Sequence, residues 1–409
     1  MKKISLRATA LAVATLATTS AFATDGYFPH GYGMKSLGMG GASVAMTDNA
    51  FAGANNPATA AFAGNRVDLG VNIFMPSRGV DENFGQPYVD SGSKTFLVPE
   101  FGYNKSIDAQ VSAGVTVYGN GGMNTDYAAG KILSFSGSGA TGVNLMQLIV
   151  APTIAYKLNE ASSVGVSPLL VYQMFKAQGL GAFAGYSSDG SNLSDKGNDS
   201  STGLGVRVGY YSALSDVVSV GASYSPKTKM SKFGSYAGLF AGGGSFDIPE
   251  NYSLGASIKA TDSLKVALDY ERINYSGVPA ISNPSTNLTS GAALGAANGP
   301  GFGWSDVNVF KIGAEWQYSP TVILRVGFNS STNPVQSRDV TFNILAPGVV
   351  TRHYTFGGTY QLQKDAELTW AYMRAPKNSV TGNHLLGATT NQTISMSQQS
   401  LGVQYSWKF

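Results

Sequence analysis

Residues 24–64 read TDGYFPHGYGMKSLGMGGASVAMTDNAFAGANNPATAAFAG, and they decide how the rest of the sequence is interpreted. Glycines are scattered through the segment and no apolar period of 2 or 3.6 lasts longer than one turn, so it cannot form a core of its own. It nevertheless carries too many large apolar side chains for a solvated linker, among them Phe28, Phe51 and Phe62. We therefore expect this segment to be packed inside a wall that the rest of the chain forms.

One short helix is predicted within this segment. Asn56 is a favourable N-cap residue, Pro57 suits the first helical position, and Ala58 begins an alanine-rich run. We expect the helix to begin at Pro57.

The N-terminus has the pattern of a secretory signal. Three basic residues precede an apolar run at 11–17, and residues 21–23 (AFA) form a small-residue cleavage site. The apolar run is shorter than the roughly 20 residues that a membrane-spanning helix needs. We predict that residues 1–23 are a signal peptide.

Composition limits the function classes. Without the signal, 24 of the 27 basic residues remain against 24 acidic ones, so the charge gives no indication of a nucleic-acid partner. The lack of cysteine excludes disulfide-stapled domains and cysteine–metal chemistry. Only 12% of residues are charged, against about 25% in soluble domains. With many glycines and aromatics, and no long apolar stretch after the signal, this composition is typical of a transmembrane β-barrel.

From residue 65 onward the chain repeats a run of about ten residues in which apolar residues alternate with polar or small ones. In the last run, Leu401, Val403 and Tyr405 alternate with Gly402 and Gln404. Such alternation indicates strands with one apolar and one polar face, although a soluble β-sandwich would show it too.

The connections distinguish these two folds. We place about fourteen strands, at residues 65–78, 94–105, 109–119, 144–158, 161–176, 201–214, 216–231, 250–261, 263–276, 306–319, 321–331, 349–363, 365–376 and 396–409. Tight connections alternate with long ones, as in an outer-membrane meander with short periplasmic turns and long outer loops. Greek-key links in a sandwich would not keep this order.

The chain ends in Phe409, with Trp407 and Tyr405 on the same face, which looks like the C-terminal aromatic signal that outer-membrane barrels present to the barrel-insertion machinery. About fourteen strands enclose a lumen wider than side chains can fill, so the unpaired N-terminal segment fits as a plug. We divide the chain into a signal peptide (1–23), an N-terminal plug (24–64) and an all-β, antiparallel outer-membrane barrel (65–409).

Several short motifs are left over: SLGMGGA at 36–42, DNA at 48–50, NPA at 56–58, VP at 98–99, YGNG at 118–121, IPE at 248–250 and NPV at 333–335. Together, and above all through Asn56-Pro57-Ala58 (the NPA motif) in a glycine-rich segment directly after a signal peptide, they make the chain similar to the FadL/TodX family. This family comprises outer-membrane transporters of long-chain fatty acids and aromatic hydrocarbons. The resemblance covers essentially the whole mature chain.

The resemblance implies passive uptake of hydrophobic small molecules across the outer membrane of a Gram-negative bacterium. It implies a monomer without a cofactor, in contact with outer-membrane lipid and lipopolysaccharide. Ligand would be captured among the outer loops, pass a site beside the plug and leave sideways where the third strand is kinked inward. Here that strand is followed by Gly119, Asn120 and Gly121, and glycines permit a bend. The alternative is an ordinary glycine-rich loop start.

Candidate site residues follow from the same resemblance. The NPA motif is expected in the plug near the opening of the third strand, unless it is only a capped helix start. Candidates for the ligand path are Phe28, Phe51 and Phe62 in the plug, and Leu239 and Phe240 in the apolar loop stretch 236–241. The similar stretch 179–184 is a candidate partner of that loop. The alternative is that either stretch only caps the barrel mouth.

Charged residues of both signs face the predicted lumen. The cations are Arg207, Lys311, Arg325 and Arg352. The anions are Asp269, Glu271, Glu315 and Glu367. Opposite charges in a barrel interior usually pair, so these residues do not choose between an anionic and a neutral ligand.

The alternatives in function are an outer-membrane lipid-modifying enzyme and a general porin. The chain has three histidines, His30, His353 and His384, far apart in sequence, and no G-x-S-x-G or H-E-x-x-H motif. We therefore expect no catalytic residue, no metal site and no cofactor. A plug argues against a porin. The sequence leaves the substrate open among fatty acids, monoaromatics, alkanes and terpenoids.

Overall fold

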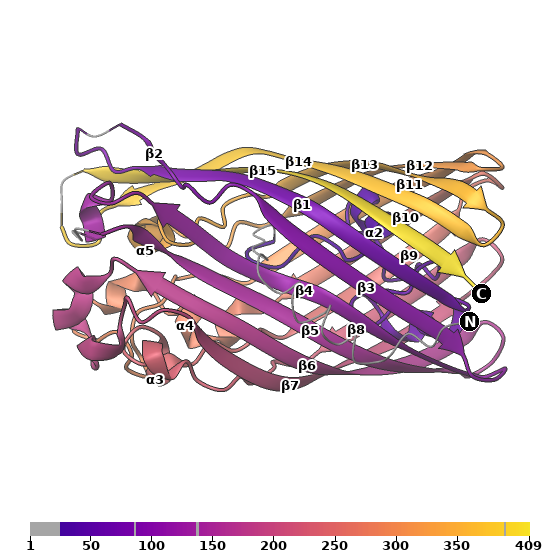
Figure 1. Cartoon of the computed structure of the whole chain (residues 1–409), viewed down its shortest axis with the longest axis horizontal. Helices are drawn as coiled ribbons and strands as arrows, with labels where there is room; N and C mark the ends of the chain where they lie inside the picture. Colours follow the sequence, from indigo (N-terminus) through magenta and orange to yellow (C-terminus); the bar gives the residue numbers. More distant parts are fainter. Residues whose placement is uncertain (1–24, 86, 136–138, 388–389) are drawn as a thin grey trace, which may run out of the picture.

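The computed structural model describes residues 25–409 except 86, 136–138 and 388–389. The predicted signal peptide, residues 1–23, lies outside the described residues. Within the described ranges, no helix is long and apolar enough to cross a membrane. One large antiparallel sheet makes up most of the molecule (Figure 1).

The sheet follows the sequence order of its strands, and β15 pairs with β1 to close it. The strands are β1 (Arg66–Asp81), β2 (Val89–Asp90), β3 (Phe96–Ser106), β4 (Val111–Tyr127), β5 (Thr141–Lys157), β6 (Ser162–Gln178), β7 (Asp199–Ala213), β8 (Val218–Ser225), β9 (Asn251–Lys259), β10 (Leu264–Ile273), β11 (Val307–Ser319), β12 (Val322–Ser331), β13 (Arg352–Gln363), β14 (Ala366–Asn383) and β15 (Asn391–Lys408). The short β2 pairs only with the end of β1, so fourteen strands form the wall. The predicted antiparallel barrel of about fourteen strands is confirmed.

Short helices lie inside the barrel and in the outer loops. They are α2 (Met34–Gly38), η1 (Pro57–Phe62), η2 (Leu133–Phe135), η3 (Gly181–Tyr186), η4 (Gly190–Asn192), η5 (Gly234–Tyr236), α3 (Ala241–Gly244), η6 (Tyr275–Gly277), α4 (Pro279–Ser282), η7 (Ser285–Asn287), η8 (Ser337–Asp339) and α5 (Val340–Asn343). Asn56 caps η1, and its side chain accepts the Ala58 N–H at 3.1 Å. The helix begins at Pro57, as predicted.

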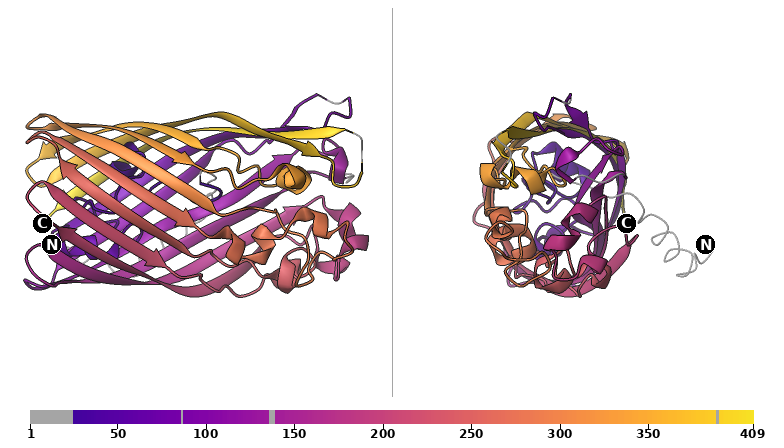
Figure 2. Two further views of the ribbon diagram at one scale, coloured as in Figure 1. Left: turned by 180° about the vertical axis from the view of Figure 1, so that it is seen from behind. Right: turned by 90° about the vertical axis from the view of Figure 1, so that its left-hand side faces the viewer.

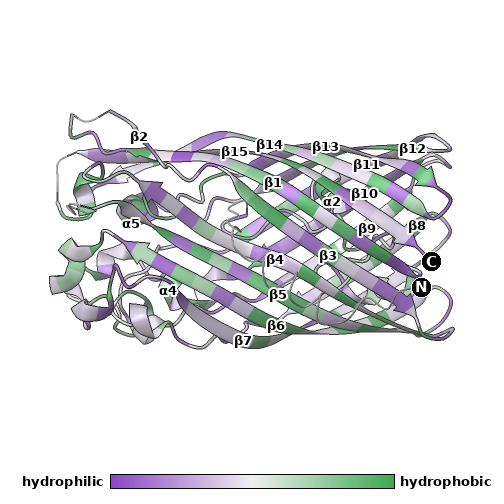
Figure 3. Cartoon of the chain, viewed as in Figure 1, coloured by the Kyte–Doolittle hydropathy of each residue, from purple (hydrophilic) through white to green (hydrophobic). Residues whose placement is uncertain are grey.

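Alternation along each strand decides which side chains face outward. In β15, Leu401, Val403 and Tyr405 are about half exposed, whereas Gln404 and Ser406 are buried. Hydropathy alternates in the same way along the other wall strands (Figure 3). A strand that spans a bilayer needs apolar side chains on its outer face, and here the inner face is polar. The backbone groups of the strand are bonded within the closed sheet, as the bilayer also requires.

The two ends of the barrel differ. Tight turns, such as 107–110 and 158–161, gather at the end where the C-terminus lies, and the opposite end carries the long loops with α3, α4 and α5 (Figures 1 and 2). The predicted alternation of short and long connections is confirmed. The strand boundaries differ most in β4, which continues to Tyr127 rather than ending at 119. A bulge at Gly119–Gly121 causes this difference, because the glycines that permit it look like a loop start in the sequence.

Residues 25–64, which we call the lumen segment, lie inside the barrel (Figure 2), and nearly all of them are buried. Wall carboxylates accept backbone N–H groups that the segment leaves unpaired. Asp269 Oδ2 accepts the N–H of Ser43 at 2.6 Å and of Val44 at 3.0 Å, and Glu100 Oε2 accepts that of Gly33 at 3.1 Å. The acidic residues of the wall therefore hold the segment in place through its backbone.

Candidate ligand pathway

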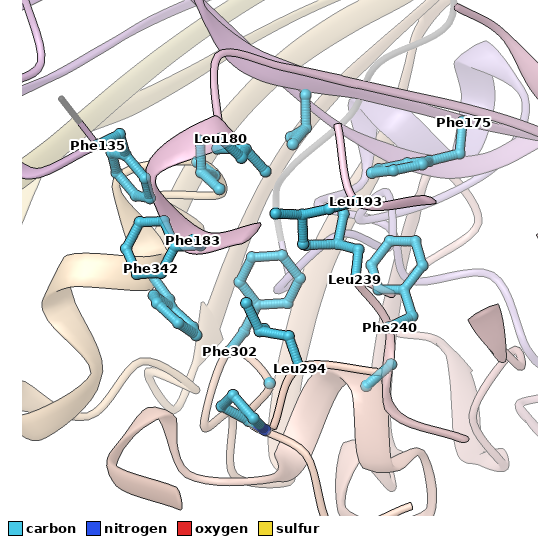
Figure 4. A pocket seen from close by; sticks show the side chains of 15 residues that line it. Phe135, Phe175, Leu180, Phe183, Leu193, Leu239, Phe240, Leu294, Phe302 and Phe342 are labelled. Carbon is cyan, nitrogen blue, oxygen red and sulfur yellow. The ribbon is translucent and has the colours of Figure 1, made fainter. Parts of the chain in front are cut away.

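A pocket of about 500 Å³ lies among the outer loops, and we call it the loop pocket. Its lining consists of Phe135, Val143, Phe175, Leu180, Phe183, Leu193, Leu239, Phe240, Ala280, Leu294, Pro300, Gly301, Phe302, Phe342 and Leu345. Figure 4 shows these side chains converging from several loops. The structure thus brings Leu239 and Phe240, from the loop after β8, together with Leu180 and Phe183, from the loop after β6.

Aromatic contacts hold the loop pocket together. The Phe183 ring lies 5.4 Å from Phe135 and 5.7 Å from Phe342, measured between centroids, and Phe240 lies 4.6 Å from Phe175. Every lining side chain is apolar. A ligand that enters gains about 0.8 kcal/mol for each methylene removed from water. The pocket is therefore suited to the apolar part of a ligand.

An aromatic cluster leads from the loop pocket to the start of the lumen segment. Phe302 of the pocket lies 6.2 Å from Trp304, and Trp304 stacks edge-on against Tyr275 at 5.2 Å. Tyr275 in turn lies 5.5 Å from Tyr27 and 6.2 Å from Phe28. Tyr275 also fixes the segment by donating its hydroxyl to the Asp25 carbonyl at 2.7 Å. Of the three plug aromatics named from the sequence, Phe28 belongs to this cluster.

Phe51 and Phe62 have other surroundings. Phe51 is fully buried against Gly33, where a Cβ atom would lie 2.5 Å from its ring. Phe62 lies 5.1 Å from the Tyr211 ring, and the Lys157 ammonium sits 5.0 Å above it. Both rings contribute packing between the lumen segment and its surroundings, and their predicted place on a ligand path stays a prediction.

β4 approaches the lumen segment where its sequence contains Gly119, Asn120 and Gly121. Its pairing with β5 shifts register between Gly119 and Gly121, and Gly121 has a φ of +143°. The next N–H, of Gly122, donates to the carbonyl of Tyr27 at 3.3 Å. Residues 118–123 are all buried, in contrast to the alternation elsewhere in the wall. This part of β4 is therefore covered on both faces.

The same bend separates β4 from β3. Their pairing ends at Phe101 with Val117, and beyond it β3 pairs only with β1 and β4 only with β5 among the described residues. We call this stretch the unpaired interval. Its outer end is closed by the Gly92 N–H, which donates to the Asp126 carbonyl at 2.7 Å. That the interval lets ligand out sideways stays a prediction at this point.

The NPA motif packs against other strands. Asn56 Nδ2 donates to the Tyr210 carbonyl of β7 at 2.9 Å, and Ser163 Oγ of β6 donates to the Ala58 carbonyl at 2.8 Å. The bent part of β4 bonds instead to Tyr27, whose carbonyl accepts the Gly122 N–H, and to Tyr32, whose hydroxyl donates to Asn120 Oδ1 at 3.2 Å. The capped helix packs against β5, β6 and β7 and also touches β4, and the expectation that the motif lies at the opening of the third strand stays a prediction.

Most charged residues that were predicted to face the lumen are paired. Lys311 Nζ lies 2.7 Å from Glu271 Oε2, and Arg325 Nη2 lies 2.7 Å from Glu315 Oε2. Glu367 Oε1 is 2.7 Å from Lys35 Nζ. These charges neutralise one another, as predicted.

Arg207 and Arg352 behave differently from this group. Arg207 donates to the carbonyls of Gly53, at 3.3 Å, and Ala54, so it anchors the lumen segment. Arg352 is exposed on the outer face, and its predicted place in the lumen is wrong. It is the first residue of β13, where its neighbour His353 takes the inward position.

Two histidines from distant parts of the sequence meet beside the lumen segment. The rings of His30 and His353 are nearly parallel, with centroids 5.4 Å apart. Burial, together with the neighbouring His353 and Lys311, lowers the pKa of His30. Asn329 lies between His353 and Asp25. The Asn329 Oδ1 atom is 3.2 Å from His353 Nδ1, and the Asn329 Nδ2–H donates to Asp25 Oδ2 at 3.2 Å. Burial raises the pKa of Asp25 to about 7.

Sequence patterns missed this pairing because it joins the lumen segment to the wall. Within the described part of the chain, no group of three or more His, Cys, Asp or Glu residues has an arrangement that could hold a metal ion.

Known proteins can now be compared with this architecture. A family model described as outer membrane protein transport protein (OMPP1/FadL/TodX) matches residues 10–409. No curated protein sequence matches the chain. Among solved structures, the P. putida toluene transporter TodX is 24% identical with a TM-score of 0.71, over 93% of this chain and 99% of that one.

Two further structures agree. The Ralstonia pickettii toluene transporter TbuX is 20% identical with a TM-score of 0.66, over 93% of this chain and 99% of its own. A Pseudomonas aeruginosa FadL homologue is 14% identical with a TM-score of 0.71, over 94% and 99%. These likenesses show the fold, and the family match confirms the predicted outer-membrane location. The chain belongs to the OMPP1/FadL/TodX family of outer-membrane transport proteins.

Proposed function

We propose that this protein takes up hydrophobic small molecules passively. Ligand binds in the loop pocket, moves along the aromatic cluster beside Tyr27 and Phe28, and leaves sideways through the unpaired interval. The observation that carries the proposal is the row of ring contacts of 5.2 to 6.2 Å that joins the pocket to Tyr27, whose carbonyl bonds to the bent part of β4. Apolar groups accompany the ligand along this whole distance.

An unpaired interval in a membrane wall needs a physical explanation, because free backbone groups are costly in lipid. Here the lumen segment and an inner loop satisfy part of β4. Gly122 N–H bonds to Tyr27, and Thr125 Oγ1 donates to the Leu345 carbonyl at 2.9 Å. This arrangement supports an interval that is stable without strand pairing and is therefore available to ligand.

The lumen segment supports the other half of the proposal. We place the plug at residues 24–64 and the barrel wall at 65–409. A lumen filled by buried side chains and backbone contacts opposes free passage of water-soluble molecules along the barrel axis. The hydrophobic route to the side is then separate from the axial one.

Transport without covalent chemistry fits this family, and we propose no catalytic role for His30, His353 or His384. The sheet closes on itself through β15 and β1, and the lumen segment bonds to β4 at the unpaired interval, which supports a monomer. Phe409 is half exposed and lies 5.8 Å from Trp407, in a position to meet the barrel-insertion machinery. The apolar outer face would contact outer-membrane lipid and lipopolysaccharide.

Placing a charge in the loop pocket tests the proposal. Phe240→Glu buries an unpaired carboxylate where ligand binds, and we expect it to lower the initial rate of toluene uptake by about tenfold or more. Tyr186→Glu is the matched control, because Tyr186 lies in a neighbouring outer loop with its ring half exposed and does not line the pocket. Uptake is measured with radiolabelled toluene in cells that carry equal amounts of folded barrel.

Two outcomes would contradict the proposal. Equal uptake by the two variants would remove the loop pocket from the route. Uptake by wild-type cells that is no faster than in cells without the protein would remove the transport of hydrophobic molecules altogether.

A further inference from the structure

Two arginines lie close together on the outer face of the wall. Arg352 begins β13 and Arg374 lies on β14, and both are exposed at outward-facing positions. Tyr354, two residues after Arg352, pairs directly with Arg374. The two arginines are therefore diagonal neighbours on adjacent strands, about 7–8 Å apart. Arg352 follows the loop that holds α5, so the pair lies toward the end of the barrel that carries the long loops (Figure 1).

The protein provides no counter-charge for this pair. Strands β12 to β15 contain one acidic residue, Glu367, which pairs with Lys35 inside the lumen. The loops before β13 and after β14 also contain one, Asp339, which is buried and lies 3.1 Å from Arg338. Among the described residues, neither arginine of the outer face has an acidic partner.

Arg272 shows how the wall accommodates an outward arginine elsewhere. It lies near the same end of the barrel, on β10, and its Nη2 atom is 2.7 Å from Asp306 Oδ2. Its Nε and Nη1 atoms donate to the side chains of Asn274 and Asn308, both at 2.9 Å. A charge on the lipid-facing side of a barrel is costly at the middle of the bilayer and much less so near the head groups. The wall neutralises Arg272 itself and leaves the pair on β13 and β14 to a partner from outside.

Aromatic side chains follow the arginine pair toward the middle of the wall. The next outward positions are Tyr354 and Tyr372, and after them come Phe356 and Trp370. The rings of Phe356 and Trp370 lie 5.2 Å apart. Tyrosine and tryptophan favour the level at which a bilayer meets water. The order from the outer end is therefore cationic, then tyrosine, then apolar, which matches a lipid with a phosphate, a sugar and acyl chains.

We propose that Arg352 and Arg374 bind a phosphate group of lipopolysaccharide. The long loops of an outer-membrane barrel face the cell exterior, so lipid at this level belongs to the outer leaflet, where lipopolysaccharide is the main lipid. A planar guanidinium binds phosphate with two parallel hydrogen bonds, and an anion between the two arginines offsets their mutual repulsion. Tyr354 and Tyr372 contact the sugar that carries the phosphate, and the acyl chains lie along Phe356.

The inference rests on the contact with lipopolysaccharide that we proposed for the outer face, and it gives that contact a specific site. It makes no use of the loop pocket or of the unpaired interval. Toluene uptake should therefore be the same with and without the arginine pair.

Two lipids that both carry phosphate test this inference. Diphosphoryl lipid A and phosphatidylglycerol are titrated separately into purified protein in detergent, and bound lipid is measured by native mass spectrometry. We expect wild type to bind lipid A more tightly. Arg352→Gln/Arg374→Gln loses the charge-assisted hydrogen bonds, so its affinity for lipid A should fall on the order of 10- to 100-fold. Its affinity for phosphatidylglycerol should stay within about twofold of wild type.

Two further variants complete the design. Arg272→Gln removes an outward arginine that already has a carboxylate partner, so its affinity for lipid A should stay within about twofold of wild type. Arg352→Lys/Arg374→Lys keeps both charges without the planar guanidinium and should retain part of the affinity. It also serves if Arg352→Gln/Arg374→Gln fails to give a folded barrel, as judged by heat-modifiable mobility in gel electrophoresis.

The outcomes separate this inference from the proposals on which it rests. Equal lipid A affinities of Arg352→Gln/Arg374→Gln and Arg272→Gln would overturn the site and leave the contact with lipopolysaccharide in place. Wild type that binds phosphatidylglycerol as tightly as lipid A, or that releases lipid A to an excess of inorganic phosphate, would show that the pair accepts any phosphate and would overturn the inference too. Wild type that binds no lipid A would overturn both the site and the contact, while the uptake of hydrophobic molecules stands on its own test.

Discussion

Gly121→Ala changes the bend of β4 directly. Gly121 has a φ of +143°, and a Cβ atom there would lie far inside van der Waals contact of the Tyr27 carbonyl oxygen. Tyr27 must then move, and its hydrogen bond from Gly122 is lost. Backbone strain of about 1–3 kcal/mol and about 1 kcal/mol for the hydrogen bond together disfavour the bent strand by roughly 2–4 kcal/mol. This free energy corresponds to a roughly 30- to 700-fold shift toward a straighter strand.

The assay separates exit from capture. If ligand leaves through the unpaired interval, Gly121→Ala should lower toluene uptake by about tenfold or more, while toluene binding to purified protein stays within about twofold. Gly185→Ala in an outer loop is the matched control, because no atom lies within 4 Å of a Cβ placed there. A Gly121→Ala protein that takes up toluene as fast as the Gly185→Ala protein would refute the lateral route, provided that both bind toluene equally.

Three further perturbations test the lumen segment. Deleting residues 24–64 should leave a barrel that conducts small ions in planar bilayers, and a conductance equal to that of the full chain would contradict a plug. Asp269→Ala removes the acceptor of two N–H groups of the lumen segment, at 2.6 and 3.0 Å. Docking of the segment on the wall should weaken by about 2–4 kcal/mol, and brief channel openings should become more frequent. Openings as rare as in wild type would argue against this anchor. Burial raises the pKa of Asp25 from 3.8 to about 7, so the stability that its protonated form contributes is complete below about pH 4 and is lost as the pH rises through 7. In guanidinium unfolding Asp25→Asn should therefore exceed wild type in stability at pH 8 and equal it at pH 4, and a difference that does not change with pH would contradict the buried carboxyl.

The barrel was predictable because its determinants are local. A bilayer outside and a polar lumen inside impose a period of 2 on every strand, and an outer-membrane meander has its short turns at one end and its long loops at the other. The extent of β4 was not predictable in the same way. Gly119 and Gly121 are consistent with a loop start and with a bulge, and the choice depends on Tyr27, which accepts the N–H that a neighbouring strand would otherwise bond.

The site was predictable only in part, because its contacts join distant segments. Leu239 and Phe240 could be predicted as candidates because an apolar stretch in a loop is recognisable in the sequence without knowledge of its contacts. The His30–His353 stack depends on which residues the closed barrel places opposite one another, and the proximity of Arg352 to Arg374 depends on the register of β13 with β14. Arg352 shows a further limit, since the first residue of a strand can take either face until the register with its neighbours is known.

The inward glycines of the wall connect the sequence to the position of the plug. In the alternating pattern, glycine occupies the same positions as the small and polar residues of the inner face. The pattern therefore predicts a lumen, but it does not indicate what fills the lumen. At Gly165 on β6 a Cβ atom would collide with the backbone of Pro57, and at Gly209 on β7 with the side chain of Asn56. Any other residue at these positions would push the capped helix away from the wall. These glycines therefore mark the surface on which the NPA motif docks, and a search for inward glycines on neighbouring strands would have placed the motif against β6 and β7.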